Sequence, residues 1–339
     1  MNETEHSSRK NQSHEDHTAH SHSHGVIEPT LAANERGIWA LKWSFVGLLI
    51  TALFQVVVVY FSGSVALLAD TIHNFGDAAT AVPLWIAFAL ARRKPSRQFT
   101  YGLGRVEDLA GVAIVLVILL SGIVAGYQSV QRLMQPQPVE YLWAVILASV
   151  VGFAGNEMVA IFRIRIGKEI NSAALVADGY HARVDGLTSL AVLLGAIGVW
   201  LGFPLADPII GLLIALAILK IVWDSSKTVF SRLLDGVEPK IIDELKSAAG
   251  HVQGVHEVSE VRGRWLGHRL SAEINITVPS QLSVGQAHAV ALEVRHELLH
   301  HLSYLSNVTI HVDPVDVSGE EHHRIEKHAH DGLPAHSHK

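Results

Sequence analysis

Six long apolar segments lie between residues 38 and 227 and are separated by short polar connections. The segments cover 38–61, 65–91, 106–134, 141–162, 173–201 and 205–223. About 20 helical residues cross a hydrocarbon core that is about 30 Å thick, so each segment is long enough to span a bilayer. The pattern predicts an α-helical membrane protein with a six-helix transmembrane bundle over residues 36–232.

Lysine and arginine gather in alternate connections, and this distribution predicts the orientation of the bundle. The basic residues of the second and fourth connections are Arg92, Arg93, Lys94, Arg97, Arg163, Arg165 and Lys168. The other three connections contain none, and only Arg132 lies near one of them. Because cytoplasmic connections are enriched in Lys and Arg, we expect both chain ends in the cytoplasm and the protein in the cell membrane.

Residues 233–316 follow the last apolar segment and show a different pattern. Helical spacing occurs at 241–245 and 284–302, and strand-like segments occur at 256–264, 270–278 and 308–312. In the second of these strands every other residue is apolar, which is typical of a half-buried strand. The order αββαβ can form a small sheet with both helices on one face, so we expect a cytoplasmic ferredoxin-like, metallochaperone-like domain.

The two chain ends, 1–35 and 317–339, are rich in histidine and lack a long apolar run. Each contains six of the 22 histidines. Such segments bury too little apolar surface to offset their conformational entropy, so both are expected to be disordered tails. Their histidines are expected either to capture metal ions for the rest of the protein or only to buffer metal ions around it.

Composition excludes several classes of protein. There are 0 cysteines in 339 residues, which excludes disulfide scaffolds, iron–sulfur clusters and thiol catalysis. The net charge of −6 provides no basic surface for nucleic acid. Charged residues make up only 17% of the chain, as expected when much of it contacts a lipid bilayer.

A nine-residue pattern, A-D-x-x-H-x-x-x-D, occurs in both the second and the fifth apolar segments. It places His73 four residues before Asp77, and His181 four residues before Asp185. Residues four apart share a helix face, so two facing pairs would supply two nitrogen and two oxygen ligands, a shell that suits tetrahedral Zn²⁺. The alternative is that each pair forms a hydrogen bond within its helix, but two copies inside a membrane favour a metal site.

Three further charged residues belong to the two copies of this pattern. Asp70 and Asp178 lie three residues before the histidines. They are candidates for acceptors that orient the ligands, with ordinary helix-end carboxylates as the alternative. Arg183, between the two ligands of the second copy, is expected to neutralise a neighbouring acid.

With these features, the sequence resembles the cation diffusion facilitator family of metal/proton antiporters. Three other segments carry the resemblance: Phe99–Glu107 (FTYGLGRVE), Ala206–Pro208 (ADP) and Thr309–Pro314 (TIHVDP). The resemblance implies that the two His/Asp pairs form the transport site and that the protein is a homodimer. Members with histidine at the first position of both motifs are typically zinc transporters, so Zn²⁺ is the expected ion, with cobalt, cadmium, nickel or iron as alternatives.

The resemblance also implies metal binding in the cytoplasmic domain. The corresponding candidates are His256, His268, His288, His311 and Asp313. Asn275 stands where related sequences can have a histidine ligand, which would change the number of bound ions. The connection 92–101 contains no His or Asp, so no metal site is expected there.

Metal and protons compete for such ligands, because bound metal requires neutral imidazole and ionised carboxylate. We therefore expect zinc export driven by proton entry. A competing hypothesis is an intramembrane zinc metalloenzyme, which would need an open coordination position and a general base. The chain contains no HExxH motif, and four ligands would already fill the shell. A metal-sensing or storage protein would leave the two intramembrane motifs unexplained.

Overall fold

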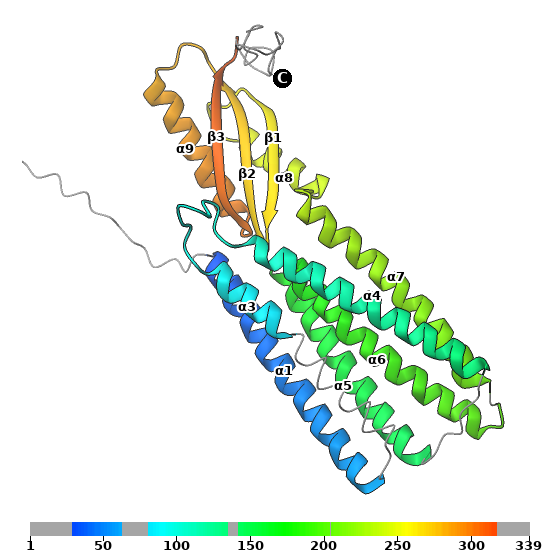
Figure 1. Ribbon diagram of the computed structural model, residues 1–339. Helices are drawn as coiled ribbons and strands as arrows, with labels where there is room; N and C mark the ends of the chain where they lie inside the picture. The colour runs from blue at the N-terminus through cyan, green and yellow to red at the C-terminus, as the bar shows by residue number, and fades with distance from the viewer. Residues whose placement is uncertain (1–28, 63–80, 135–141, 204, 317–339) are drawn as a thin grey trace, which may run out of the picture.

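The computed structural model describes residues 29–62, 81–134, 142–203 and 205–316 (Figure 1). A long helical bundle carries a small α/β domain at one end. The helices of the bundle are α1 (Pro29–Ser62), α3 (Ala81–Ala91), α4 (Arg105–Met134), α5 (Leu142–Glu169), α6 (Ala173–Trp200) and α7 (Ala206–Leu233).

Within the described residues, five helices are long and apolar enough to cross a membrane: α1, α4, α5, α6 and α7. The expected second span, 65–91, is represented by α3, which has 11 residues. The earlier part of this span lies outside the described residues. The helical bundle is therefore confirmed, whereas the described chain contains five full spans and one short helix where six full spans were expected.

Two helix boundaries differ from the sequence expectation in an informative way. Helix α5 continues to Glu169, so Arg163, Arg165 and Lys168 lie on a helix and not in a connection. Helix α1 begins at Pro29, inside the segment assigned to the first tail. Long basic side chains are good helix formers, so α5 continues through them beyond the apolar run. Proline suits a first helical position, so α1 can begin at Pro29, before its apolar run.

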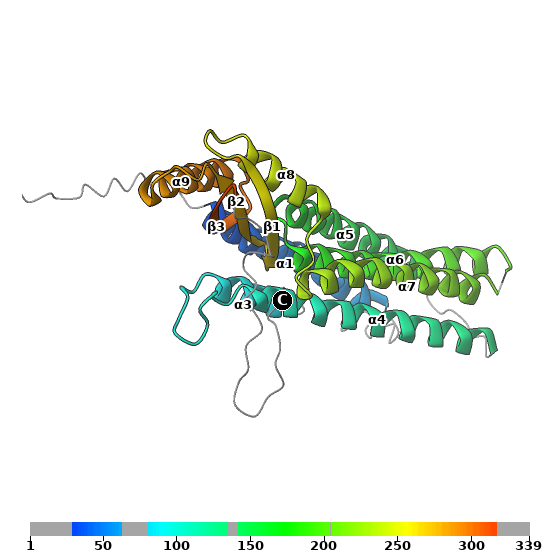
Figure 2. The ribbon, with the colours of Figure 1, turned by 90° about the horizontal axis from the view of Figure 1, so that it is seen from above.

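The bundle is built from antiparallel neighbours, with α4 beside α7 and α5 beside α6 (Figures 1 and 2). Glycine permits the closest of these contacts. A Cβ atom at Gly179 of α6 would lie only 2.9 Å from the backbone nitrogen of Ile164 on α5. Any larger residue would push the two helices apart, so this position sets the distance between the helices beside the intramembrane motif.

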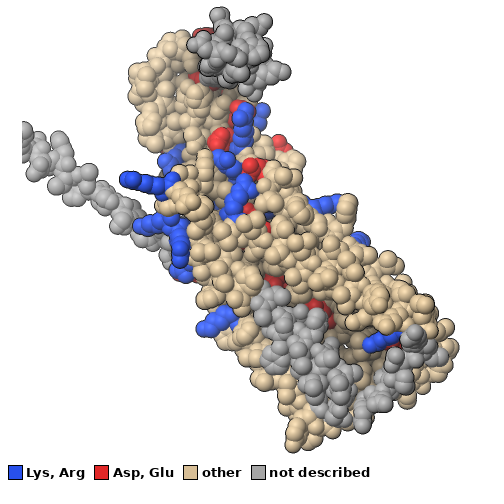
Figure 3. Space-filling view, in the orientation of Figure 1, with Lys and Arg blue, Asp and Glu red and all other residues tan. Residues whose placement is uncertain are grey.

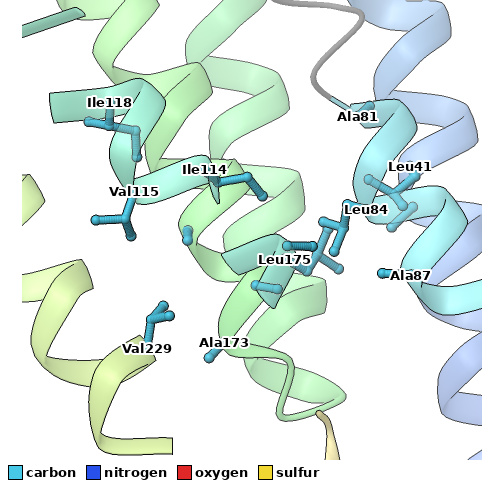
Figure 4. Packing of buried hydrophobic residues seen from close by; sticks show 14 of the residues in the cluster. Leu41, Ala81, Leu84, Ala87, Ile114, Val115, Ile118, Ala173, Leu175 and Val229 are labelled. Atoms are coloured by element: carbon cyan, nitrogen blue, oxygen red, sulfur yellow. The ribbon is translucent and has the colours of Figure 1, made fainter. Parts of the chain in front are cut away.

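Aliphatic side chains from all six described bundle helices form a core that runs from the end near the α/β domain to the middle of the bundle. Leu84 of α3, Ile118 of α4, Leu175 of α6 and Ile218 of α7 are each fully buried. Leu41 of α1 lies on the far side of Leu84 in this cluster (Figure 4). The outer faces are also apolar, and Figure 3 shows few charged side chains over the length of the helices. Such a surface is suited to lipid.

The α/β domain consists of α8 (Pro239–Gly250), β1 (Glu257–Leu266), β2 (Arg269–Val278), α9 (Val284–His301) and β3 (Leu305–Pro314). The sheet order is β1-β2-β3, with β1 antiparallel and β3 parallel to β2. Helices α8 and α9 contact each other and cover one face (Figure 2). The predicted αββαβ order is confirmed.

The alternating pattern predicted for the second strand is also present. Leu270, Ala272, Ile274, Ile276 and Val278 of β2 are all buried. Because β2 is the central strand, parts of its other face are covered as well, and Ser271 and Thr277 are buried. Helix α9 begins with a capping box in which the Ser283 and Gln286 side chains bind each other's backbone.

Candidate functional site

The second copy of the intramembrane motif lies on α6 and begins about one turn after the start of this helix. Ser172 caps this helix, and its hydroxyl accepts a hydrogen bond of 3.0 Å from the Leu175 backbone nitrogen. From this start, the helix carries His181 and Asp185 on one buried face. Their exposed fractions are 1% and 8%, so both ionisable groups lie inside the bundle.

These two side chains lie close together but do not share a direct hydrogen bond. His181 Nδ1 and Asp185 Oδ1 are 3.9 Å apart, beyond the usual hydrogen-bond range. Ligand atoms about 2 Å from a tetrahedral zinc ion are about 3.3 Å from each other. A small side-chain rotation of either group would therefore bring both atoms to ligand distance.

The first copy of the motif lies outside the described residues. This applies to His73 and Asp77, and to Asp70 before them. Helix α3 follows this segment directly in the chain and contacts α6. The structure thus describes one half of the predicted four-ligand site, and the four-ligand arrangement stays a prediction.

Asp178, one turn before His181, forms a buried ion pair with an arginine of α5. Arg163 Nη1 lies 2.9 Å from Asp178 Oδ2, and the side chains are 1% and 0% exposed. Asp178 is therefore the counter-ion of Arg163. The sequence could not indicate this pairing, because Arg163 was expected in a cytoplasmic connection and not on a helix beside the motif.

Arg183 also has an acidic partner on α5, as expected. Its guanidinium donates to both oxygens of Glu157, at 3.2 Å and 2.7 Å. Such a two-bond contact fixes the orientation of both side chains. The Glu157 carboxylate neutralises the positive charge of Arg183. The pair also connects α5 to α6 beside the motif.

The five metal ligands predicted for the α/β domain do not all lie together. His311 and Asp313 lie together on β3, with Nε2 and Oδ1 3.0 Å apart. His256 is close in the sheet, since its backbone nitrogen donates to Thr277, the residue paired with Asp313. His288 is exposed on α9. In the part of the chain that the structure describes, no three His, Asp or Glu side chains form a ready metal site.

Asn275, the departure noted in the sequence, stands directly beside His311 in the sheet register. Its amide nitrogen donates to Glu260 Oε2 at 3.1 Å. Asn275 is thus held by an acid of β1.

His268 lies at the opposite end of the sheet from the other candidates, in the turn between β1 and β2. Its Nδ1 is 2.7 Å from Glu107 Oε2 of α4, and both side chains are at most 2% exposed. The neighbouring Gly267 nitrogen donates to Asp108 Oδ2 at 3.1 Å. His268 therefore connects the α/β domain to the bundle, a contact between distant segments that the sequence analysis did not identify.

Several residues on the bundle side of this junction, Glu107 and Arg105 among them, come from the FTYGLGRVE segment. Arg105 donates to the Leu233 carbonyl at 3.0 Å and pairs with Asp235, just beyond α7. Arg232 lies over the Trp265 ring, 4.3 Å from its centroid. Lys and Arg side chains are visible around this end of the bundle in Figure 3. The segment quoted for the family resemblance thus holds the two domains together.

A helical membrane bundle with a buried His/Asp pair and an αββαβ domain at one end defines a class of metal-cation transporters. The cation efflux transmembrane domain family matches residues 41–234, and the cation efflux protein cytoplasmic domain matches residues 237–315. These matches cover most of the chain. The protein belongs to the cation efflux family, whose members are transporters.

One named relative from the same family is similar in sequence over most of the chain. A probable cation efflux system protein of Mycobacterium tuberculosis is 52% identical over 298 residues, which cover 87% of this chain and 90% of that protein. A manganese efflux system protein of Bacillus subtilis is 24% identical, covering 83% of this chain and 98% of that protein. A solved MamM cytoplasmic domain in a nickel form is 22% identical, covers 23% of this chain and 98% of that chain, and has a TM-score of 0.23.

Proposed function

We propose that this protein exports divalent transition-metal cations, Zn²⁺ foremost, from the cytoplasm in exchange for protons. The transport site would consist of His73, Asp77, His181 and Asp185. The observation that carries the proposal is the buried His181–Asp185 pair, whose ligand atoms lie 3.9 Å apart on one face of a membrane-spanning helix. An identical residue pattern occurs in the preceding half of the bundle.

The ligand chemistry supports zinc over manganese. Imidazole nitrogen favours later first-row metals, whereas all-oxygen sites suit manganese and magnesium. A relative is named as a manganese exporter, so Mn²⁺ is the informative competitor. Cobalt, cadmium, nickel and iron are the other ions to compare.

Proton exchange follows from the same ligands. Metal binding needs neutral imidazole and ionised carboxylate, so protonation of His181 and Asp185 expels the ion. On the side with fewer protons the site would load metal, and on the side with more protons it would release metal. Alternating exposure of one site then couples zinc export to proton entry.

Membrane arrangement and assembly complete the proposal. The protein would lie in the cell membrane with both ends in the cytoplasm, where Lys and Arg are concentrated. The cytoplasmic domain would pair with that of a second copy, and His256, His288, His311 and Asp313 would bind regulatory metal there. The His-rich tails would raise the local metal concentration.

The test is zinc flux in proteoliposomes that contain the full chain. Zinc uptake with an opposite change in internal pH is expected, and the Asp185→Asn variant should lose it, because an amide cannot act as an anionic ligand. Asp243→Asn, the same change at an exposed site on α8, should leave the flux intact. Retained flux in Asp185→Asn would exclude the proposed site, and preferred Mn²⁺ flux would exclude zinc selectivity.

A further inference from the structure

A cavity of about 80 Å³ lies between α4, α6 and α7. Its polar lining comes from Gln128, Ser129 and Arg132 of α4, Thr188 of α6 and Asp207 of α7. This is more space than a single water molecule needs, so water can occupy the cavity. Polar groups around a cavity inside a membrane bundle mark a path for ions or water.

The cavity begins one helical turn from the intramembrane half-site. Thr188 and Val192 follow Asp185 by three and seven residues, which places all three on one face of α6. Both Thr188 and Val192 line the cavity. They lie toward the end of α6 that is opposite to Ser172 and to the α/β domain, so the cavity extends outward from Asp185.

An ion pair joins the last turn of α4 to the first turn of α7. Arg132 Nη1 and Asp207 Oδ2 are 2.9 Å apart, with side chains 49% and 18% exposed. Asp207 also packs closely on α6, since a Cβ atom at Gly195 would lie 2.9 Å from its Cα. The pair therefore bridges three helices at the outer end of the cavity.

These two residues were both notable in the sequence and had no role in the transport site. Arg132 is the basic residue near an outer connection, and Asp207 belongs to the ADP segment.

We infer that the cavity is the outer half of the cation path and that the Arg132–Asp207 ion pair closes its mouth. The inference rests on the proposed transport function. A departing divalent cation replaces the guanidinium at the Asp207 carboxylate, and α4 then separates from α7.

The absence of cysteine from the sequence makes this inference testable by thiol labelling. Thr188→Cys places a single thiol in the cavity, and a charged, impermeant methanethiosulfonate reagent is added outside intact cells that express the full chain. Labelling should be slow with the ion pair intact. Adding Arg132→Gln should accelerate it about fivefold, as expected for loss of a partly exposed ion pair.

A matched control uses an ion pair at the other end of the bundle. Arg36→Gln removes the contact of Arg36 with Glu169, whose atoms are 2.8 Å apart and whose side chains are half-exposed. It should leave the labelling rate unchanged. Gln128→Cys provides a second reporter from α4 if Thr188→Cys does not reach the membrane.

The result that overturns the inference is a labelling rate that Arg132→Gln does not change, or that Arg36→Gln raises equally. The labelling needs no metal, so it is independent of transport. A wild-type protein that carries no zinc would exclude the proposed function while leaving the labelling result valid, and the two failures are therefore distinguishable.

Discussion

The buried pair between Arg163 and Asp178 provides the sharpest test of how the bundle is held together beside the motif. The perturbations are Asp178→Asn, Arg163→Met and the double variant. Each single change removes one charge and leaves the other inside the bundle, where the two side chains are 0% and 1% exposed. The double change removes both charges and keeps side chains of similar size.

The magnitude follows from the geometry. At the observed separation of 2.9 Å, two unit charges attract by about 6 kcal/mol with an effective dielectric constant of about 20. Desolvation offsets most of this attraction. Removing one partner leaves an uncompensated charge and costs about 3–5 kcal/mol, whereas the double variant should cost less than either single variant.

The assay is thermal unfolding of the purified protein in detergent. With about 2 °C per kcal/mol for a chain of this size, each single variant should lower the midpoint by about 6–10 °C. Arg36→Gln, at an exposed pair, should shift it by less than about 2 °C. The reasoning is refuted if both single variants also shift the midpoint by less than about 2 °C, or if the double variant shows the sum of their effects.

Three further outcomes are expected. Gly267 has φ of 67°, and a Cβ there would lie 2.6 Å from Glu107 Oε2. Gly267→Ala should therefore lower the free energy of unfolding by about 1–3 kcal/mol and speed hydrogen exchange in the β1–β2 turn. The control Gly285→Ala, in open space, should do neither. Burial raises the pKa of Tyr304 from 10.0 to about 12. Its stabilising contribution is therefore complete below pH 10 and lost as the pH rises towards 12, and Tyr304→Phe should flatten this part of a melting-temperature profile. Deletion of residues 1–28, which contain all six histidines of the first tail and end before α1, should raise the apparent KM for zinc flux with little change in the maximal rate. Complete loss of flux would contradict the proposed capture role.

Much of the fold could be predicted because it depends on the length and period of apolar segments. The bundle, the αββαβ order and the buried face of β2 needed no long-range information. Helix ends were less predictable. Arg163 marks the end of an apolar run in the sequence, yet α5 continues to Glu169, because the charged side chain finds a buried partner on the neighbouring helix.

Part of the candidate site could also be predicted from local spacing, and part of it could not. His181 and Asp185 share a face because helical spacing alone brings residues four apart together. The partners of the surrounding charges come from other helices, as Arg183 with Glu157 shows. Spacing within one segment contains no information about such pairs.

Local periodicity therefore determined the apolar helices, the sheet and the shared face of His181 and Asp185 on α6, since each depends on residues a few positions apart. Only the tertiary structure decided that His268 meets Glu107 at the domain junction, and that Arg132 meets Asp207 at the end of a cavity. The physical reason is that a buried charge must find its counter-ion in space, and the helix packing chooses which distant residue that is.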